Sequence, residues 1–124
     1  MEKKVSSGLK TTFLIYIIIG LIVGLGMLLF PQVWAAGVPV KEPNMYRLVG
    51  AAILGFTSGS WWAYKETAWD KVKIVVQMEI VWTILATLVI LYGLLFAGLP
   101  AVGWLNAIIH ACFAAAFTYF YSRA

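Results

Sequence analysis

The amino-acid sequence predicts an all-α integral membrane protein, a single domain built as a bundle of four transmembrane helices. Of its 124 residues, 63% are hydrophobic and 11% are charged, and the mean hydropathy is +0.92. Soluble domains carry about 25% charged residues, so a soluble fold is excluded. Each of four apolar runs is long enough to cross the roughly 30 Å hydrocarbon core of a bilayer. These runs are 11–30, 45–64, 72–97 and 101–121.

The basic residues predict how these spans are oriented. The net charge of +4 could suggest a nucleic-acid partner, but Lys and Arg stand at the ends of apolar runs rather than in a stripe with exposed aromatic residues. We therefore expect no nucleic-acid partner. With four spans, seven basic residues lie on one side and two on the other, so both termini are expected in the cytoplasm, with the chain in the cell membrane. The seven are Lys3, Lys4, Lys10, Lys65, Lys71, Lys73 and Arg123, and the two are Lys41 and Arg47.

The first predicted span, 11–30, follows a short basic head. A cleaved signal peptide is the alternative, because Val33-Trp34-Ala35 loosely resembles a cleavage site. The apolar run has about 18 residues, longer than the 7 to 15 of a secretory signal, so we expect it to be retained. Gly20 and Gly24 form a GxxxG step, which suits either an ordinary helix contact or a dedicated dimer face.

Prolines interrupt the chain between the first two spans. Pro31, Pro39 and Pro43 remove backbone donors, so 31–44 cannot be helical throughout. Trp34 is placed to lie at the level of the lipid headgroups. This loop is either a plain connector or a lid or contact surface.

The second predicted span, 45–64, has Asn44 as a possible N-cap and Arg47 in its first turn. Arg47 either extends its guanidinium to the membrane surface or faces the bundle interior, where it would bind an anionic or carbonyl group. One side of the helix gathers small residues, which predicts close packing against the first span. These residues are Ala51, Gly55, Ser58 and Gly59.

Aromatic residues surround the connection 65–73. Rings beside lysines are typical of a membrane interface, and a cage for a ligand cation is the alternative. The aromatic residues are Trp61, Trp62, Tyr64 and Trp69.

The third predicted span, 72–97, carries a carboxylate, Glu79, about two turns in from Lys71 and Lys73. A side chain this deep cannot easily reach bulk water and is too costly to leave in lipid. We therefore expect Glu79 to face other helices, on the same side as Trp82 and Thr83.

The fourth predicted span, 101–121, follows the uncharged turn 97–100, so the last two spans should form an antiparallel hairpin. Asn106 and His110 share a face of this span. Cys112 is the single cysteine, which excludes an intramolecular disulfide, and we interpret it as a small packing residue.

Glu79 and His110 are the central candidates for a polar site. At 1.5 Å per residue they lie about 10 Å and about 16 Å from the cytoplasmic edge, so adjacent helices could pair them directly or through a water, and such a pair can carry protons. In the alternative, Glu79 is protonated or hydrogen-bonded to a hydroxyl, while His110 is neutral and bonded to a carbonyl or to Asn106. The hydroxyls considered are those of Ser58, Ser60 and Thr83.

The chain offers little for a metal, a cofactor or catalysis. One histidine, one buried glutamate and one cysteine at three depths do not supply a coordination sphere. Nucleotide-binding and hydrolase motifs are absent from the sequence, as is a pair of haem ligands. We expect no bound cofactor and do not favour an enzyme.

The layout of the chain resembles a known family. Phe30-Pro31 at the end of the first span, the proline-bearing loop and Arg47-Leu48-Val49-Gly50-Ala51-Ala52 at the start of the second resemble the DoxX-like group of small four-helix membrane proteins. The resemblance implies a membrane subunit near quinol oxidase or thiol-oxidoreductase assemblies, with Arg47 as the residue carried over. The chain lacks a cysteine pair and a histidine cluster, which argues against an independent catalytic role. Small multidrug transporters have a similar size but carry a glutamate in their first span, and here that span has no carboxylate.

Three functions stay open at this point. The first is a non-catalytic accessory subunit that binds a small ligand such as a quinone, and the second is an oligomeric proton-coupled transporter in which Glu79 carries the proton. The third is a purely structural membrane protein. The expected partners are the lipid bilayer and either another membrane protein or further copies of the chain. The candidate site residues are Arg47, Ser58, Glu79, Asn106 and His110.

Overall fold

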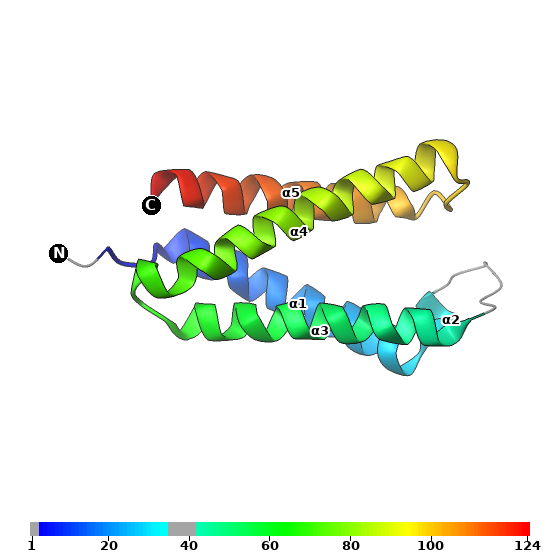
Figure 1. Cartoon of the computed structure of the whole chain (residues 1–124), viewed down its shortest axis with the longest axis horizontal. Helices are drawn as coiled ribbons and strands as arrows, with labels where there is room; N and C mark the ends of the chain where they lie inside the picture. The colour runs from blue at the N-terminus through cyan, green and yellow to red at the C-terminus, as the bar shows by residue number, and fades with distance from the viewer. Residues whose placement is uncertain (1–2, 35–41) are drawn as a thin grey trace. The chain divides into compact units, whose positions relative to one another are not determined.

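A computed structural model of the chain describes residues 3–34 and 42–124. The described residues form five helices, and the predicted all-α fold is confirmed (Figure 1). The helices are α1 (Ser7–Leu29), α2 (Pro31–Trp34), α3 (Pro43–Lys65), α4 (Trp69–Phe96) and α5 (Gly103–Arg123).

The chain divides into two compact units. The first unit combines the described residues up to Thr12 with Glu66–Ala124, and the second is Phe13–Lys65. Helix α1 is continuous, so its first turns belong to the first unit and the remainder to the second.

Three of the described helices, α1, α4 and α5, are long and apolar enough to cross a membrane. Helix α3 has 23 residues and therefore the necessary length, but it is less apolar than the other three. Membrane insertion is thus supported by three helices, and the fourth span stays a prediction.

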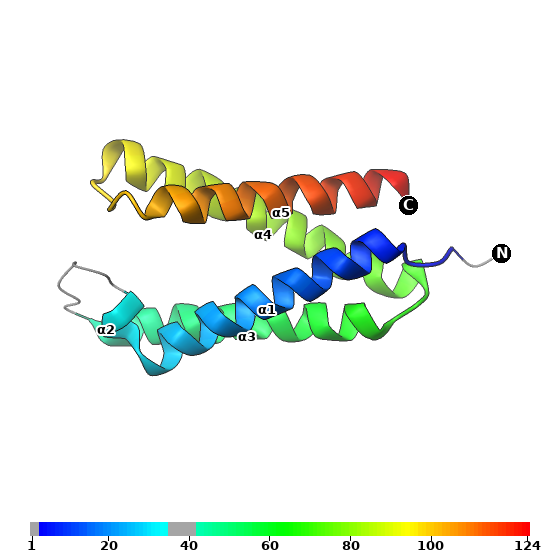
Figure 2. The same cartoon turned by 180° about the vertical axis from the view of Figure 1, so that it is seen from behind.

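In the second unit, α1 and α3 lie side by side and run in opposite directions (Figure 1 and Figure 2). Their backbones approach closely at glycines. A methyl group added at Gly50 would lie 2.7 Å from the carbonyl oxygen of Gly24 and 2.8 Å from the amide nitrogen of Leu28, and one added at Gly20 would collide with the Thr57 hydroxyl. The GxxxG step of α1 therefore makes a helix contact within the chain.

The face of α3 that makes this contact is not the predicted one. Gly50 and Thr57 are buried, whereas Ala51 and Gly55 are exposed. A methyl group at Gly55 would meet nothing within 4 Å. The sequence places small residues at both 50 and 51, which point about 100° apart on a helix. Only the fit to α1 selects between the two faces.

The two ends of the loop region differ in detail from the prediction. The short helix α2 follows Phe30, and the indole of Trp34 lies over Gly26. Helix α3 begins at Pro43, a favoured first position because proline has no N–H to satisfy, so Asn44 lies inside the first turn rather than capping it. The lid or connector between them falls on 35–41, outside the described residues.

In the first unit, α4 and α5 form the predicted antiparallel hairpin (Figure 1 and Figure 2). The turn depends on Gly98, which has φ +68°, a backbone conformation that residues with a Cβ rarely adopt. The amide of Leu99 donates to the carbonyl of Gly93 at 3.0 Å, and the Leu99 side chain packs over that glycine. Helix α5 then begins at Gly103, two residues later than predicted.

The basic head is tied to the start of α4, which the sequence did not predict. Lys4 and Ala68 form an isolated antiparallel bridge. The amide of Val5 donates to the carbonyl of Thr67 at 2.8 Å, and the amide of Trp69 donates to the carbonyl of Lys3 at 2.8 Å. After α1 and α3, the chain therefore comes back to lie beside its own basic head.

Candidate functional site

Glu79 is buried in the first unit, with 1% of its surface exposed. It belongs to the buried stripe of α4, between Val76 and Thr83. The Thr83 hydroxyl donates to the main-chain carbonyl of Glu79 at 2.6 Å, so its proton is not directed to the Glu79 carboxyl group. The sequence placed Glu79 at a position that faces protein, and its burial agrees with that interpretation.

His110 is held by its own helix and by α4. Its Nδ1 lies 2.9 Å from the carbonyl oxygen of Asn106, and because a carbonyl only accepts, Nδ1 carries the proton. The imidazole meets the ring of Trp82 edge-on, with 6.3 Å between centroids. This is the carbonyl-bonded arrangement of the alternative interpretation, and the proton-linked pair with Glu79 stays a prediction.

Arg47 lies at the exposed end of α3. Its Nη1 donates to the Oδ1 of Asn44 at 3.0 Å, one turn away on the same helix. This geometry corresponds to the surface alternative for Arg47, with the guanidinium at the end of the span.

The second unit carries a groove of about 340 Å³ on α1 and α3. Of the candidate site residues predicted from the sequence, Ser58 lines this groove. The lining consists of Ile17, Leu21, Leu54, Thr57, Ser58 and Trp61.

The two hydroxyl groups of this groove already donate hydrogen bonds to the backbone of α3. The Thr57 hydroxyl donates to the carbonyl of Ile53 at 2.7 Å, and the Ser58 hydroxyl donates to the carbonyl of Gly55 at 2.7 Å. What the groove presents is therefore aliphatic surface, two hydroxyl oxygens and the indole of Trp61. This surface suits an apolar ligand with a small polar end.

Trp61 connects the groove to the charged end of α3. The Nζ of Lys65 lies 4.6 Å from the centre of the Trp61 ring, and Tyr64 stacks on that ring at 6.1 Å between centroids. The cation beside this tryptophan is thus one of the chain's own lysines.

The groove was not predicted from the sequence. Its α3 members follow the spacing i, i+3, i+4, i+7 of one helix face, and this was the available signal. These members are Leu54, Thr57, Ser58 and Trp61. The signal is weak by itself, because any packed helix shows the same spacing.

Cys112 is exposed, so its interpretation as a packing residue is wrong. Helix α5 buries Ala107 and Phe117, which are each five residues from Cys112. At about 100° per residue, Cys112 points about 140° away from both. Among the described residues, no group of three or more His, Cys, Asp or Glu side chains could hold a metal ion.

The comparisons with known proteins give no relative. No protein-family model, no curated protein and no solved structure matches this chain.

Proposed function

We propose that this chain is a non-catalytic, multi-pass membrane subunit that binds a small apolar ligand, a quinone or a lipid, in the groove of the second unit. The observation that carries the proposal is the groove itself. Its volume of about 340 Å³ is within the roughly 300–1,000 Å³ of ligand pockets, and its lining is apolar with Trp61 at one end. The indole N–H is a donor of the kind that pairs with a quinone carbonyl. A place in a quinol oxidase or thiol-oxidoreductase assembly, which the DoxX-like resemblance implies, is part of the same proposal.

The proposed topology has four spans with both termini in the cytoplasm. Helix α1 leads away from the head, and the bridge between Lys4 and Ala68 brings the end of α3 back to it. If α1 crosses the membrane, the chain between α1 and Ala68 has to cross it again, and α3 has the length to do so. The seven-to-two distribution of Lys and Arg supports the cytoplasmic assignment.

Quinone titration of the purified protein in nanodiscs tests the ligand proposal. With decylubiquinone as the probe, we expect saturable binding that Leu21→Trp abolishes by filling the groove and that Trp61→Ala weakens about tenfold, or about 1.4 kcal/mol. Trp62→Ala is the matched control, because Trp62 is the neighbouring exposed tryptophan and does not line the groove. The proposal fails if the wild type shows no saturable binding, or if the Trp62 variant loses as much affinity as the Trp61 variant.

Proton-coupled transport is the second candidate, because Glu79 is buried in a helix long and apolar enough to span a membrane. Intramembrane carboxylates of this kind mark proton pathways in many transporters. Infrared difference spectroscopy tests it: a transporter predicts that the Glu79 carboxyl titrates between about pH 5 and 8, with a signal absent from Glu79→Gln, and that His110→Ala moves the titration. A carboxyl that stays protonated across this range rules this candidate out.

A further inference from the structure

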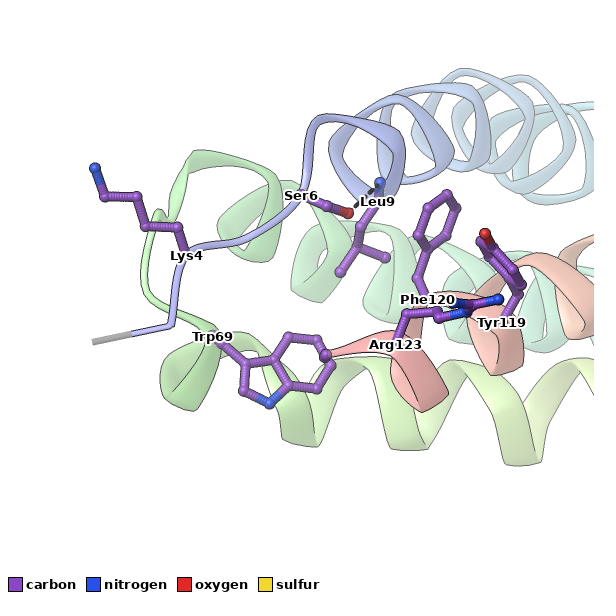
Figure 3. Close-up of a pocket in the computed structure, with 8 residues that line it drawn as sticks. Lys4, Ser6, Leu9, Trp69, Tyr119, Phe120 and Arg123 are labelled. Atoms are coloured by element: carbon purple, nitrogen blue, oxygen red, sulfur yellow. Dashed lines mark hydrogen bonds between the residues drawn. The ribbon is translucent and has the colours of Figure 1, made fainter. Parts of the chain in front are cut away.

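A second pocket, of about 270 Å³, lies in the first unit, where the head, the start of α4 and the end of α5 meet. Leu9, Trp69 and Phe120 supply apolar walls, and Arg123 extends across one side of the pocket (Figure 3). Lys4 belongs to the lining through its backbone end, while its ammonium group extends away from the other residues (Figure 3). The pocket is thus apolar inside and basic at its edge.

The basic side chains of this pocket have no ion-pair partner among the described residues. Neither Lys4 nor Arg123 forms an ion pair with another described residue, and none of the lining residues carries a carboxylate side chain. The nearby lysines of α4 differ in this respect, since Lys71 pairs with Glu66 at 3.4 Å and Lys73 with Asp70 at 2.8 Å. The Arg123 guanidinium is therefore available to an anion in the pocket.

Arg123 is oriented by an aromatic ring. Its guanidinium carbon lies 5.5 Å from the centre of the Tyr119 ring. Stacking uses the face of the guanidinium and leaves its N–H edges for acceptors, and these edges match a phosphate in a bidentate arrangement.

A hydroxyl donor stands on the opposite side, at the start of α1. The amide of Leu9 donates to the Oγ of Ser6 at 3.2 Å, so Ser6 acts as an acceptor there and keeps its own O–H as a donor (Figure 3). The ring of Phe120 packs on the first turn of α1, since a methyl group added at Gly8 would lie 2.6 Å from the ring carbon Cζ. This contact holds the aromatic wall against α1.

We propose that this pocket binds the phosphate group of an anionic membrane lipid. The Arg123 edge and the Ser6 hydroxyl bind the phosphate oxygens, and the walls from Leu9 and Phe120 receive the apolar part next to the headgroup. The Lys4 ammonium extends away from the pocket, so it adds positive charge near the site without contacting the phosphate. A soluble phosphate shares the ionic chemistry but makes no use of the apolar walls. The pocket lies at the end of the chain assigned to the cytoplasmic leaflet, where anionic lipids concentrate. The site is separate from the groove of the second unit, and its test does not depend on a quinone.

Native mass spectrometry of the full chain, released from detergent micelles, tests the site. The probes are phosphatidylglycerol and phosphatidylcholine, with inorganic phosphate as a competitor. A cation next to an anionic lipid surface contributes about 1 kcal/mol, so Arg123→Gln should weaken phosphatidylglycerol binding about fivefold, and Lys4→Gln should weaken it in the same direction. Lys71→Gln is the control, because it removes the same charge from a lysine that is already paired.

Arg123→Lys keeps the charge and loses the planar fork, so it should bind with an affinity between those of the wild type and Arg123→Gln. Circular dichroism confirms that each variant is folded, and Lys4→Gln gives an independent result if the Arg123 variants do not fold. Equal binding of the two lipids overturns the proposal, and so does a loss in Lys71→Gln as large as in Arg123→Gln. Displacement of the lipid by millimolar inorganic phosphate would instead identify a soluble phosphate as the ligand.

Discussion

The contact between α1 and α3 gives the sharpest prediction for stability. In Gly50→Ala, the added methyl group would lie 2.7 Å from the Gly24 carbonyl oxygen and 2.8 Å from the Leu28 amide nitrogen. Both are backbone atoms, so neither can rotate away, and the two helices have to separate. The substitution should therefore weaken the pairing of the helices in the second unit.

The size of the effect follows from two opposing terms. Overpacking at a close contact costs about 1–3 kcal/mol, and backbone neighbours place this site toward the upper end. Replacing glycine by alanine inside a helix recovers about 1 kcal/mol. We expect Gly50→Ala to lower the free energy of unfolding by about 1–2 kcal/mol.

Gly55→Ala is the matched control, because it makes the same chemical change five residues further along the same helix. A methyl group there meets nothing within 4 Å, so only the helix-propensity term applies and the variant should be as stable as the wild type or more stable. Unfolding by sodium dodecyl sulfate in mixed micelles, followed by circular dichroism, measures both. The reasoning is refuted if Gly50→Ala is as stable as the wild type, or if Gly55→Ala is destabilised equally.

Three further predictions concern the other parts of the chain. Gly98→Ala should destabilise the turn between α4 and α5 by about 1–2 kcal/mol, because alanine is strained at φ +68°, and an unchanged melting temperature would contradict this. Phe117→Ala, at a side chain with 0% exposure, should lower stability by about 3–5 kcal/mol, whereas Phe96→Ala, at 75% exposure, should have little effect; equal losses would show that the burial is misassigned. Reporter fusions at the two termini should both be cytoplasmic, and opposite locations would exclude an even number of spans.

The positions of the helices were predictable because long apolar runs leave little choice in a bilayer. The predicted span 72–97 corresponds to α4, Trp69–Phe96, and 45–64 corresponds to α3, Pro43–Lys65. The largest error is at the start of α1, which begins at Ser7 rather than at residue 11. The amide of Leu9 donates to the Ser6 Oγ at 3.2 Å, so a polar side chain caps the helix and the polar residues directly after it are helical. Hydropathy does not record such bonds.

The pairing of surfaces could not be predicted from one sequence. Helix α3 packs on α1 through the face that carries Gly50, and the shape of α1 decides this against the neighbouring face of small residues. The bridge from Lys4 to Ala68 joins segments that are far apart in the chain. The groove and the basic pocket follow from those pairings, so they were out of reach as well. Glu79 was within reach, because the cost of a carboxylate in lipid by itself requires burial.

Helix α3, the proposed fourth span, shows how average hydropathy can understate the apolar surface of a helix. A helix in a bilayer meets lipid only through its exposed side chains, and on α3 the exposed side chains include the apolar Leu48, Val49 and Trp62. The residues that lower the average include Thr57 and Ser60, and both are buried. The Thr57 hydroxyl is bonded to the carbonyl of Ile53, so it needs no water. The average hydropathy includes these buried hydroxyls, although they are not part of the exposed surface of α3. The exposed apolar side chains of α3 support the proposal that α3 is the fourth span.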